Sequence, residues 1–212
     1  MTVQPMFPLE HVLLPGEPLR LNVFEPRYRA MVRDLLDGDG TFGVTLIERG
    51  SEVGGGDVRT DVGTLALVMG HHELPDGRIM LACQGTDRFT VTRWLPDDPY
   101  PRAETEPWPD EPVDPDAWDG IRRRFTTPLA ELQDIVDQAA ARAGSPSPGP
   151  IGAPEDASPT DYTYDTTSAL PFTQLDRHAI LSAAGPAARI DAMAKALDDV
   201  LPLVRARMLP DD

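Results

Sequence analysis

The fold is decided by residues 13–32, which read LLPGEPLRLNVFEPRYRAMV. The Pro-Gly pair at 15–16 predicts a turn, because proline presets φ and glycine tolerates positive φ. Apolar residues alternate with polar ones through 19–23, which is the period of a half-buried strand. Pro26 suits the first position of a helix, where a missing N–H costs nothing, and an apolar helix face follows it. This one stretch therefore predicts a turn, a short strand and an abruptly started helix.

The rest of the front half, residues 1–113, has the pattern of short antiparallel strands. Strands are predicted at 41–47, 62–69, 78–84, 88–94 and 100–108. The last of these is flanked by prolines, which predicts an edge strand. A glycine-rich segment at 50–57 is interpreted as a hairpin loop. Short strands separated by close turns favour a small barrel or sandwich that carries one early helix.

The back half, residues 114–212, has a helical period and begins with an aspartate and a proline, which are typical of an N-cap and a first turn. Pro128 either kinks one long helix or separates two. The segment 145–159 is rich in Pro, Gly, Ser and Ala, which predicts a mobile loop. Ser158 and Thr173 each stand three residues before an aspartate, and this capping-box spacing predicts two further helix starts.

Several strings resemble those of one known family, the LON N-terminal domain, which is the substrate-binding domain of ATP-dependent Lon proteases and also occurs alone. The strings are MFPL at 6–9, VLLPG at 12–16, LRLNVFE at 19–25, RYRAM at 27–31, VGTLALV at 62–68, DGR at 76–78 and RF at 88–89. The helical half resembles the family more weakly. One departure is Arg20, where the family usually has proline.

The resemblance implies an α+β fold, with a PUA-like pseudo-barrel followed by an all-α helical bundle. It also implies a non-catalytic module that binds unfolded or damaged polypeptides, or acts as an adaptor, with a protease as a further partner. Glu25, Arg27 and Tyr28 are the family's sharpest residues here and are the candidate polypeptide-binding residues. The structural interpretation of the same residues puts the Glu25 charge at the helix N-terminus, where it suits the dipole, and pairs Arg27 with an acidic neighbour.

Charge and composition disfavour several functional classes. The formal charge is −16 with 19 basic residues, whereas nucleic-acid binders need clustered Lys and Arg to neutralise phosphates. No apolar run reaches the ~20 residues of a membrane span, and the start of the chain lacks the pattern of a secretory signal. One cysteine excludes an internal disulfide framework. We therefore expect a cytoplasmic protein without nucleic-acid or membrane partners.

Candidate residues for bond-breaking chemistry are few. The loop at 50–57 lacks the lysine of a phosphate-binding P-loop, and the chain's one lysine, Lys195, is predicted on the solvent side of a helix, unsuited to a Ser-Lys dyad. Cys83 is in phase with inward apolar residues, which favours a core position. His71 and His72 are adjacent on a strand and face opposite sides, so no metal or cofactor site is expected. The alternatives to polypeptide binding are a small hydrolase with an unrecognised site and RNA binding through the PUA-like barrel.

Overall fold

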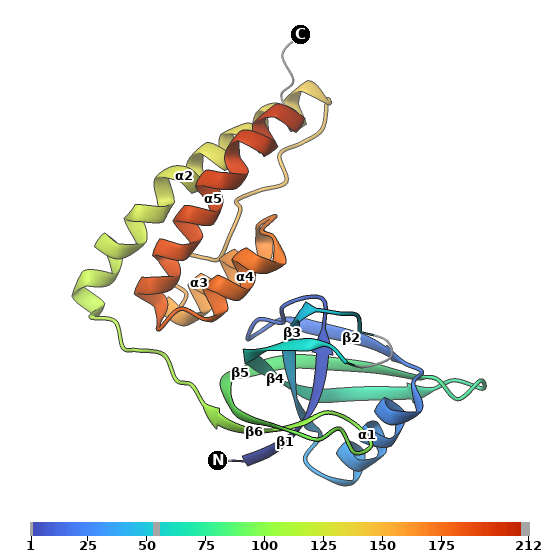
Figure 1. Cartoon of the computed structure of the whole chain (residues 1–212). Coiled ribbons are helices and arrows are strands. Elements are labelled where there is room, and N and C mark those ends of the chain that lie inside the picture. The colour runs from blue at the N-terminus through green and yellow to red at the C-terminus, as the bar shows by residue number, and fades with distance from the viewer. Residues whose placement is uncertain (1, 53–55, 209–212) are drawn as a thin grey trace. The chain divides into compact units, whose positions relative to one another are not determined.

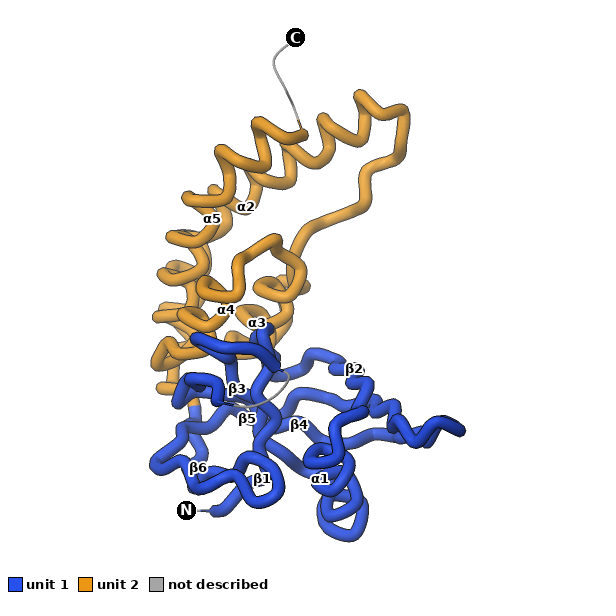
Figure 2. The backbone as a smooth tube through the Cα atoms, turned by 45° about the vertical axis from the view of Figure 1, so that its right-hand side comes forward, with its two compact units in different colours: residues 1–109 blue, residues 110–212 orange. Residues whose placement is uncertain are grey.

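The structure is a computed structural model that describes residues 2–52 and 56–208. The chain divides into two compact units, unit 1 at residues 1–109 and unit 2 at residues 110–212 (Figure 2). The sequence places this boundary at 113, whereas the main chain of Glu111 is already hydrogen-bonded within unit 2. Each unit has its own hydrophobic core.

Unit 1 is a six-stranded mixed sheet that closes on itself (Figure 1). Its strands are β1 (Thr2–Leu9), β2 (Pro18–Val23), β3 (Thr41–Arg49), β4 (Val58–Glu73), β5 (Ile79–Leu95) and β6 (Arg102–Pro107). The strand order is β2-β5-β4-β3-β1-β6, and an additional pairing of β5 with β6 closes a ring from which β2 extends. β1 and β3 pair in parallel, and the other described pairs are antiparallel. This is the predicted α+β pseudo-barrel.

Two details of the predicted strands are wrong. The edge strand predicted at 100–108 is interior, because β6 pairs with β1 on one side and with β5 on the other. The strands predicted at 78–84 and 88–94 are parts of one strand, β5. Gly85 lies at the predicted break, yet it allows a close approach rather than a turn, since a Cβ there would lie 2.4 Å from the carbonyl oxygen of Leu14.

Helix α1 (Pro26–Asp37) begins at the proline that the sequence predicts. Glu25 is its N-cap residue, although the Glu25 side chain makes no capping hydrogen bond. The apolar face of α1 packs on the inward side chains of β2 and β5 and forms the main core of unit 1. The larger members of this core are Phe7, Leu19, Leu21, Val23, Tyr28, Met31, Val32, Leu35, Phe42, Ile79 and Leu81. The alternation in the deciding stretch therefore predicts the buried side of β2 correctly.

Unit 2 is a helical bundle in which α2 and α5 lie side by side (Figure 1). Its helices are α2 (Pro115–Arg142), α3 (Pro159–Ala169), α4 (Gln174–Leu181) and α5 (Pro186–Met208). α2 continues through Pro128, so the sequence's two alternatives reduce to one long helix. The predicted caps are confirmed, because the side chains of Asp114, Ser158 and Thr173 each accept a backbone N–H of the first turn. No helix in the described part of the chain is both long and apolar enough to cross a membrane.

The segment between α2 and α3 has neither helix nor strand, as predicted, but it is tied to the bundle. The Gln133 side chain accepts the Ile151 N–H at 2.8 Å and donates to the Gly149 carbonyl at 3.1 Å. The Ala153 N–H donates to Thr166 Oγ1 at 3.0 Å. The segment is therefore irregular and hydrogen-bonded to α2 and α3 at these points, and its mobility stays a prediction.

Candidate functional site

The three residues singled out by the sequence lie at the start of α1. The Tyr28 side chain is buried, and its ring stacks on Phe7 with 4.1 Å between centroids and 16° between planes. The Arg27 guanidinium lies over the Tyr28 ring, 4.5 Å from its centroid, and Arg27 Nε donates to Glu25 Oε2 at 3.2 Å. The structure thus brings Glu25, Arg27 and Tyr28 together, with the Tyr28 ring inside the core.

An ion network extends from these residues, and we name it the α1 ion cluster: Glu25, Arg27, Asp57, Arg59 and Asp97. Arg59 Nε donates to Asp57 Oδ2 at 2.6 Å, and Arg59 Nη2 donates to Asp97 Oδ2 at 2.9 Å. Asp97 Oδ2 also lies 4.0 Å from Arg27 Nη1. Sequence reasoning missed Asp57, Arg59 and Asp97, because periodicity within single elements carries no information on pairs so far apart in the chain.

Burial and the neighbouring charges shift the pKa values of Tyr28 and Asp57. Burial raises the pKa of Tyr28 to about 12, with Arg27 opposing this rise and Asp57 and Glu25 reinforcing it. Burial is the largest single influence on the pKa of Asp57 and raises it, but the hydrogen bonds from Arg59 and the main chain, together with the charges of Arg59 and Arg27, hold that pKa below its ordinary value. At neutral pH the phenol is therefore neutral and the Asp57 carboxylate charged, an arrangement suited to holding the β2–α1 junction rather than to moving protons.

The Asp57–Arg59 pair predicts a pH dependence of unit 1 stability. The pKa of Asp57 is lower in the folded chain than its ordinary 3.8, so the pair stabilises the fold above that pH and ceases to do so as the pH falls through the folded-state pKa. Asp57→Asn should lower the free energy of unfolding at pH 7 and flatten its dependence on pH below the ordinary pKa of the carboxyl. Urea unfolding of the unchanged chain and of Asp57→Asn at a series of acid pH values tests this. The same dependence of the free energy of unfolding on pH in both proteins would contradict it.

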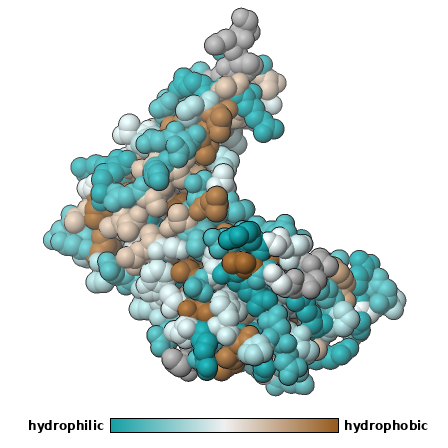
Figure 3. Space-filling model, in the orientation of Figure 1, coloured by the Kyte–Doolittle hydropathy of each residue, from teal (hydrophilic) through white to brown (hydrophobic). Residues whose placement is uncertain are grey.

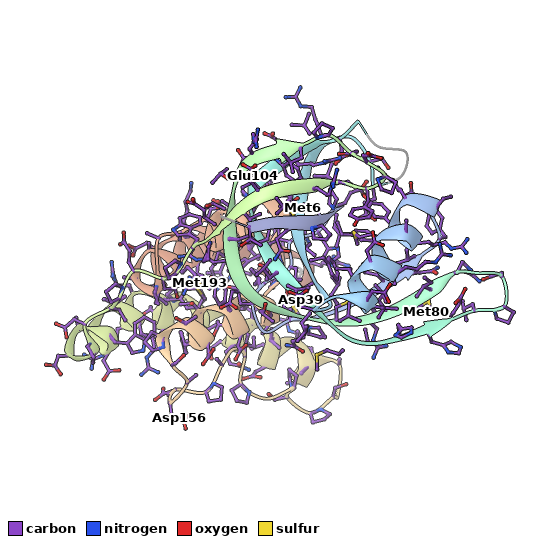
Figure 4. All side chains as sticks on the ribbon, turned by 90° about the horizontal axis from the view of Figure 1, so that it is seen from below. Met6, Asp39, Met80, Glu104, Asp156 and Met193 are labelled. Carbon is purple, nitrogen blue, oxygen red and sulfur yellow. The ribbon has the colours of Figure 1, made fainter. Side chains whose placement is uncertain are left out.

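A second surface of unit 1 combines exposed apolar side chains of β4 and β5 with Phe24, which follows directly after β2. The register places Asn22 of β2 opposite Met80 of β5, and Met80 opposite His72 of β4. Phe24 is 51% exposed, Met80 is 38% exposed and Met69 is 67% exposed. Figure 4 shows Met80 on the long hairpin formed by β4 and β5. We name this face the β2 edge surface, defined by Arg20, Asn22, Phe24, Met69, Gly70, His72, Met80 and Ala82.

The β2 edge surface differs in charge from the molecule as a whole. The chain has 35 acidic residues, but neither β2 nor the segment of β5 that it pairs with, residues 79–84, contains one. In Figure 3 most of the visible face of unit 1 is hydrophilic, with apolar residues in small separate spots. The alternation that puts residues 19, 21 and 23 inward also puts Asn22 and Phe24 outward, so the sequence held the signal for one strand of this surface. It held none for the neighbouring strands, whose register depends on tertiary pairing.

The remaining candidates do not form a second site. Cys83 is buried, as predicted, and burial raises the pKa of its thiol to about 11. His71 and His72 are exposed neighbours on β4, and within residues 2–52 and 56–208 no group of three or more metal-ligating side chains is found. Lys195 is exposed on α5, as predicted. The glycine-rich loop predicted at 50–57 lies in part outside the described residues.

Comparison with known proteins gives a consistent family. The sequence model described as "ATP-dependent protease La (LON) substrate-binding domain" matches residues 3–199. A Lon protease of Cytophaga hutchinsonii is 30% identical over 106 residues, which make up 49% of this chain and 13% of that protein. The chain thus corresponds to a small part of the length of that curated relative.

Two solved structures share the fold over nearly the whole chain. One is a Lon N-terminal domain protein from Xanthomonas campestris, with 27% identity, a TM-score of 0.62, and coverage of 92% of this chain and 98% of that chain. The other is the N-terminal domain of a Mycobacterium avium complex Lon protease, with a TM-score of 0.61, coverage of 93% and 99%, and 13% identity, which shows the fold alone. With the family match spanning all but the ends of the sequence, the chain belongs to the family of LON substrate-binding domains.

Proposed function

We propose that this chain is a non-catalytic module that binds unfolded or damaged polypeptide segments on the β2 edge surface. The observation that carries the proposal is the exposure of Phe24, Met69 and Met80 on or beside a pair of strand segments, β2 and residues 79–84 of β5, that contains no acidic residue. Unfolded chains expose the apolar side chains that folded proteins bury, so such a face favours unfolded over folded partners. Membership of a substrate-binding family supports the same function.

The proposed function is delivery rather than cleavage, with a protease as the downstream partner. The Cys83 thiol is protonated at neutral pH because burial raises its pKa to about 11, so it is a poor nucleophile. Lys195 is solvent-exposed, whereas a lysine that activates a hydroxyl must be desolvated. The net charge of −16 supports a protein partner over RNA, whose phosphates it repels.

Glu25, Arg27 and Tyr28 have a positioning role in this proposal. They follow Phe24 directly in the chain, and the α1 ion cluster fixes the turn between β2 and α1. The Tyr28 ring is stacked inside the core and offers no surface to a partner. We therefore assign contact with the polypeptide to Phe24 and Met80 rather than to the three motif residues.

A binding titration tests the proposed function. The probe is reduced, carbamidomethylated α-lactalbumin, an acidic unfolded polypeptide, compared with its native disulfide-bonded form. The 212-residue chain should bind the unfolded form and not the native form. The double variant Phe24→Ser with Met80→Ser should bind the unfolded form about ten-fold more weakly or worse, because two exposed apolar anchors are lost. Fluorescence anisotropy of the labelled probe measures both.

The matched control removes two exposed apolar side chains elsewhere, with Leu36→Ser and Leu203→Ser in one variant. This control should bind as the unchanged chain does. Equal binding of unfolded and native probe by the unchanged chain contradicts the function itself. Equal weakening in both double variants contradicts the assigned surface, while leaving the preference for unfolded chains intact.

A further inference from the structure

The free side of β2 is defined by its hydrogen bonds to β5. The Gly16 N–H donates to the Gly85 carbonyl at 3.0 Å, and the Gly85 N–H donates to the Glu17 carbonyl at 2.8 Å. In an antiparallel pair, residues that exchange main-chain hydrogen bonds alternate with residues whose N–H and C=O groups point to the opposite side. Glu17 is such a bonded residue, so every second residue after it also has its main-chain groups directed toward β5. These residues of β2 are Leu19, Leu21 and Val23.

The main-chain groups of Arg20 and Asn22 consequently point away from β5. β2 is the terminal strand of the sheet order, and no strand of the described residues pairs with its other side. Neither residue is bonded through its main chain to any loop or side chain between residues 2 and 52 or between 56 and 208. Two N–H donors and two C=O acceptors are thus available in a row, with the geometry of a strand that lacks a neighbour.

The side chains beside this row indicate what fits there. Arg20 is exposed, lies opposite Ala82, and has no ion pair within the described part of the chain. Met80 lies on the same face as Arg20, and the exposed Phe24 follows directly after β2. A segment that pairs with β2 would therefore meet an apolar row and a cation without a counter-ion. A carboxylate beside Arg20, flanked by apolar residues, is complementary to this pattern.

A second copy of this chain fits the edge poorly. Two copies would each bring a net charge of −16 and a second exposed Arg20 to the same small area. The favoured occupant is an extended segment of another polypeptide.

We propose that the bound polypeptide adds to unit 1 as an extra strand along β2, through main-chain hydrogen bonds to Arg20 and Asn22. This inference rests on the proposed function and specifies its mode of binding. Main-chain pairing is independent of the partner's sequence, while Phe24 and Met80 contribute apolar contact and Arg20 selects acidic positions. Such a mode combines tolerance of many sequences with exclusion of folded proteins, since only an extended backbone can pair.

The test removes one main-chain donor without changing the inner side of β2. Asn22→Pro deletes the outward N–H and places a ring at the edge, where sheets accept proline and where Pro18 already lies. Asn22→Ala is the matched control, because it removes the same side chain and keeps the N–H. With the unfolded α-lactalbumin probe, Asn22→Pro should bind about ten-fold more weakly than Asn22→Ala, and Asn22→Ala should bind as the unchanged chain does. Equal affinities of the two variants overturn strand addition.

Hydrogen exchange of the unchanged chain gives a second readout that needs no variant to fold. Adding the unfolded probe should slow exchange of the Arg20 and Asn22 amides, whereas the Leu21 amide, already bonded to β5, serves as the internal reference. Unaltered exchange at Arg20 and Asn22 in a chain that demonstrably binds the probe overturns the mode and leaves the proposed function standing. A dimer that Asn22→Pro converts to monomer would identify a second copy as the occupant and also overturn the proposal.

Discussion

Replacing Arg189 with methionine is expected to lower the free energy of unfolding of unit 2 by about 3–5 kcal/mol, the usual cost of breaking a buried ion pair. Arg189 is 0% exposed, and its guanidinium bonds both carboxylate oxygens of Asp110. It also donates to Thr163 Oγ1 at 2.8 Å and to the Tyr164 hydroxyl at 2.8 Å, and it lies 4.1 Å from the centre of the Tyr164 ring. Methionine matches the length of the arginine stem but removes every one of these donors.

The physical reason for so large an effect is that the lost partner is a charge. Without the guanidinium, the Asp110 carboxylate keeps its desolvation cost and loses its main compensation. Adding Asp110→Asn to Arg189→Met removes that charge. The loss of unfolding free energy in the double variant should therefore be smaller than the sum of the losses in the two single variants, by a coupling of about 1–3 kcal/mol. Arg189→Lys keeps the charge but not the planar fork and should lie between methionine and the unchanged chain.

Urea unfolding followed by far-ultraviolet circular dichroism measures the effect, because unit 2 supplies most of the helix. Arg124→Met is the matched control, since Arg124 forms an ion pair with Asp191 at 2.8 Å but is half exposed, and such surface pairs contribute about 0–1 kcal/mol. A loss in Arg189→Met no larger than in Arg124→Met would show that the buried network does not stabilise unit 2.

Sequence reasoning predicted local features of unit 2 and missed this network. The caps at Ser158 and Thr173 were predictable because each joins residues three apart in the chain. Arg189 and Asp110 lie 79 residues apart and come from α5 and the segment before α2, so no window on the sequence contains both. A buried arginine also looks the same as a surface arginine in a hydropathy pattern, and only the packed bundle distinguishes them.

In unit 1, too, the features that signals within one element indicate were predictable, and those that depend on pairing between distant elements were not. Alternation identified the buried side of β2, and Pro26 identified the start of α1, because both signals lie within one element. The closure of the ring through β5 and β6 was not predictable, because flanking prolines indicate an edge strand, and here they flank a strand that is paired on both sides. The same holds for the candidate site. The motif residues could be identified from the sequence, whereas the β2 edge surface could be identified only from the register of three strands.

Tyr28→Ala is expected to destabilise unit 1 by about 3–5 kcal/mol, the cost of deleting a buried aromatic ring. The ring is 3% exposed, and its stacking partner Phe7 belongs to β1, so its loss opens a cavity between α1 and the barrel. Tyr28→Phe keeps the ring and should change stability by about 1 kcal/mol or less. Thermal and urea unfolding of the three proteins, followed by circular dichroism, give the comparison.

These variants also separate the two interpretations of the motif residues. If Tyr28 contacted a bound polypeptide, Tyr28→Phe and Arg27→Met would lose affinity for the unfolded probe while remaining folded. If the residues position the β2–α1 junction, as burial and the α1 ion cluster favour, both variants should keep their affinity at temperatures where they are folded. Arg27→Met would then show its effect only as a lower unfolding temperature, because it loses Glu25 and the cation–π contact with Tyr28. If the variants lose stability but keep their affinity for the probe, the motif residues hold Phe24 in place. If they lose affinity at unchanged stability, the binding surface lies at the start of α1.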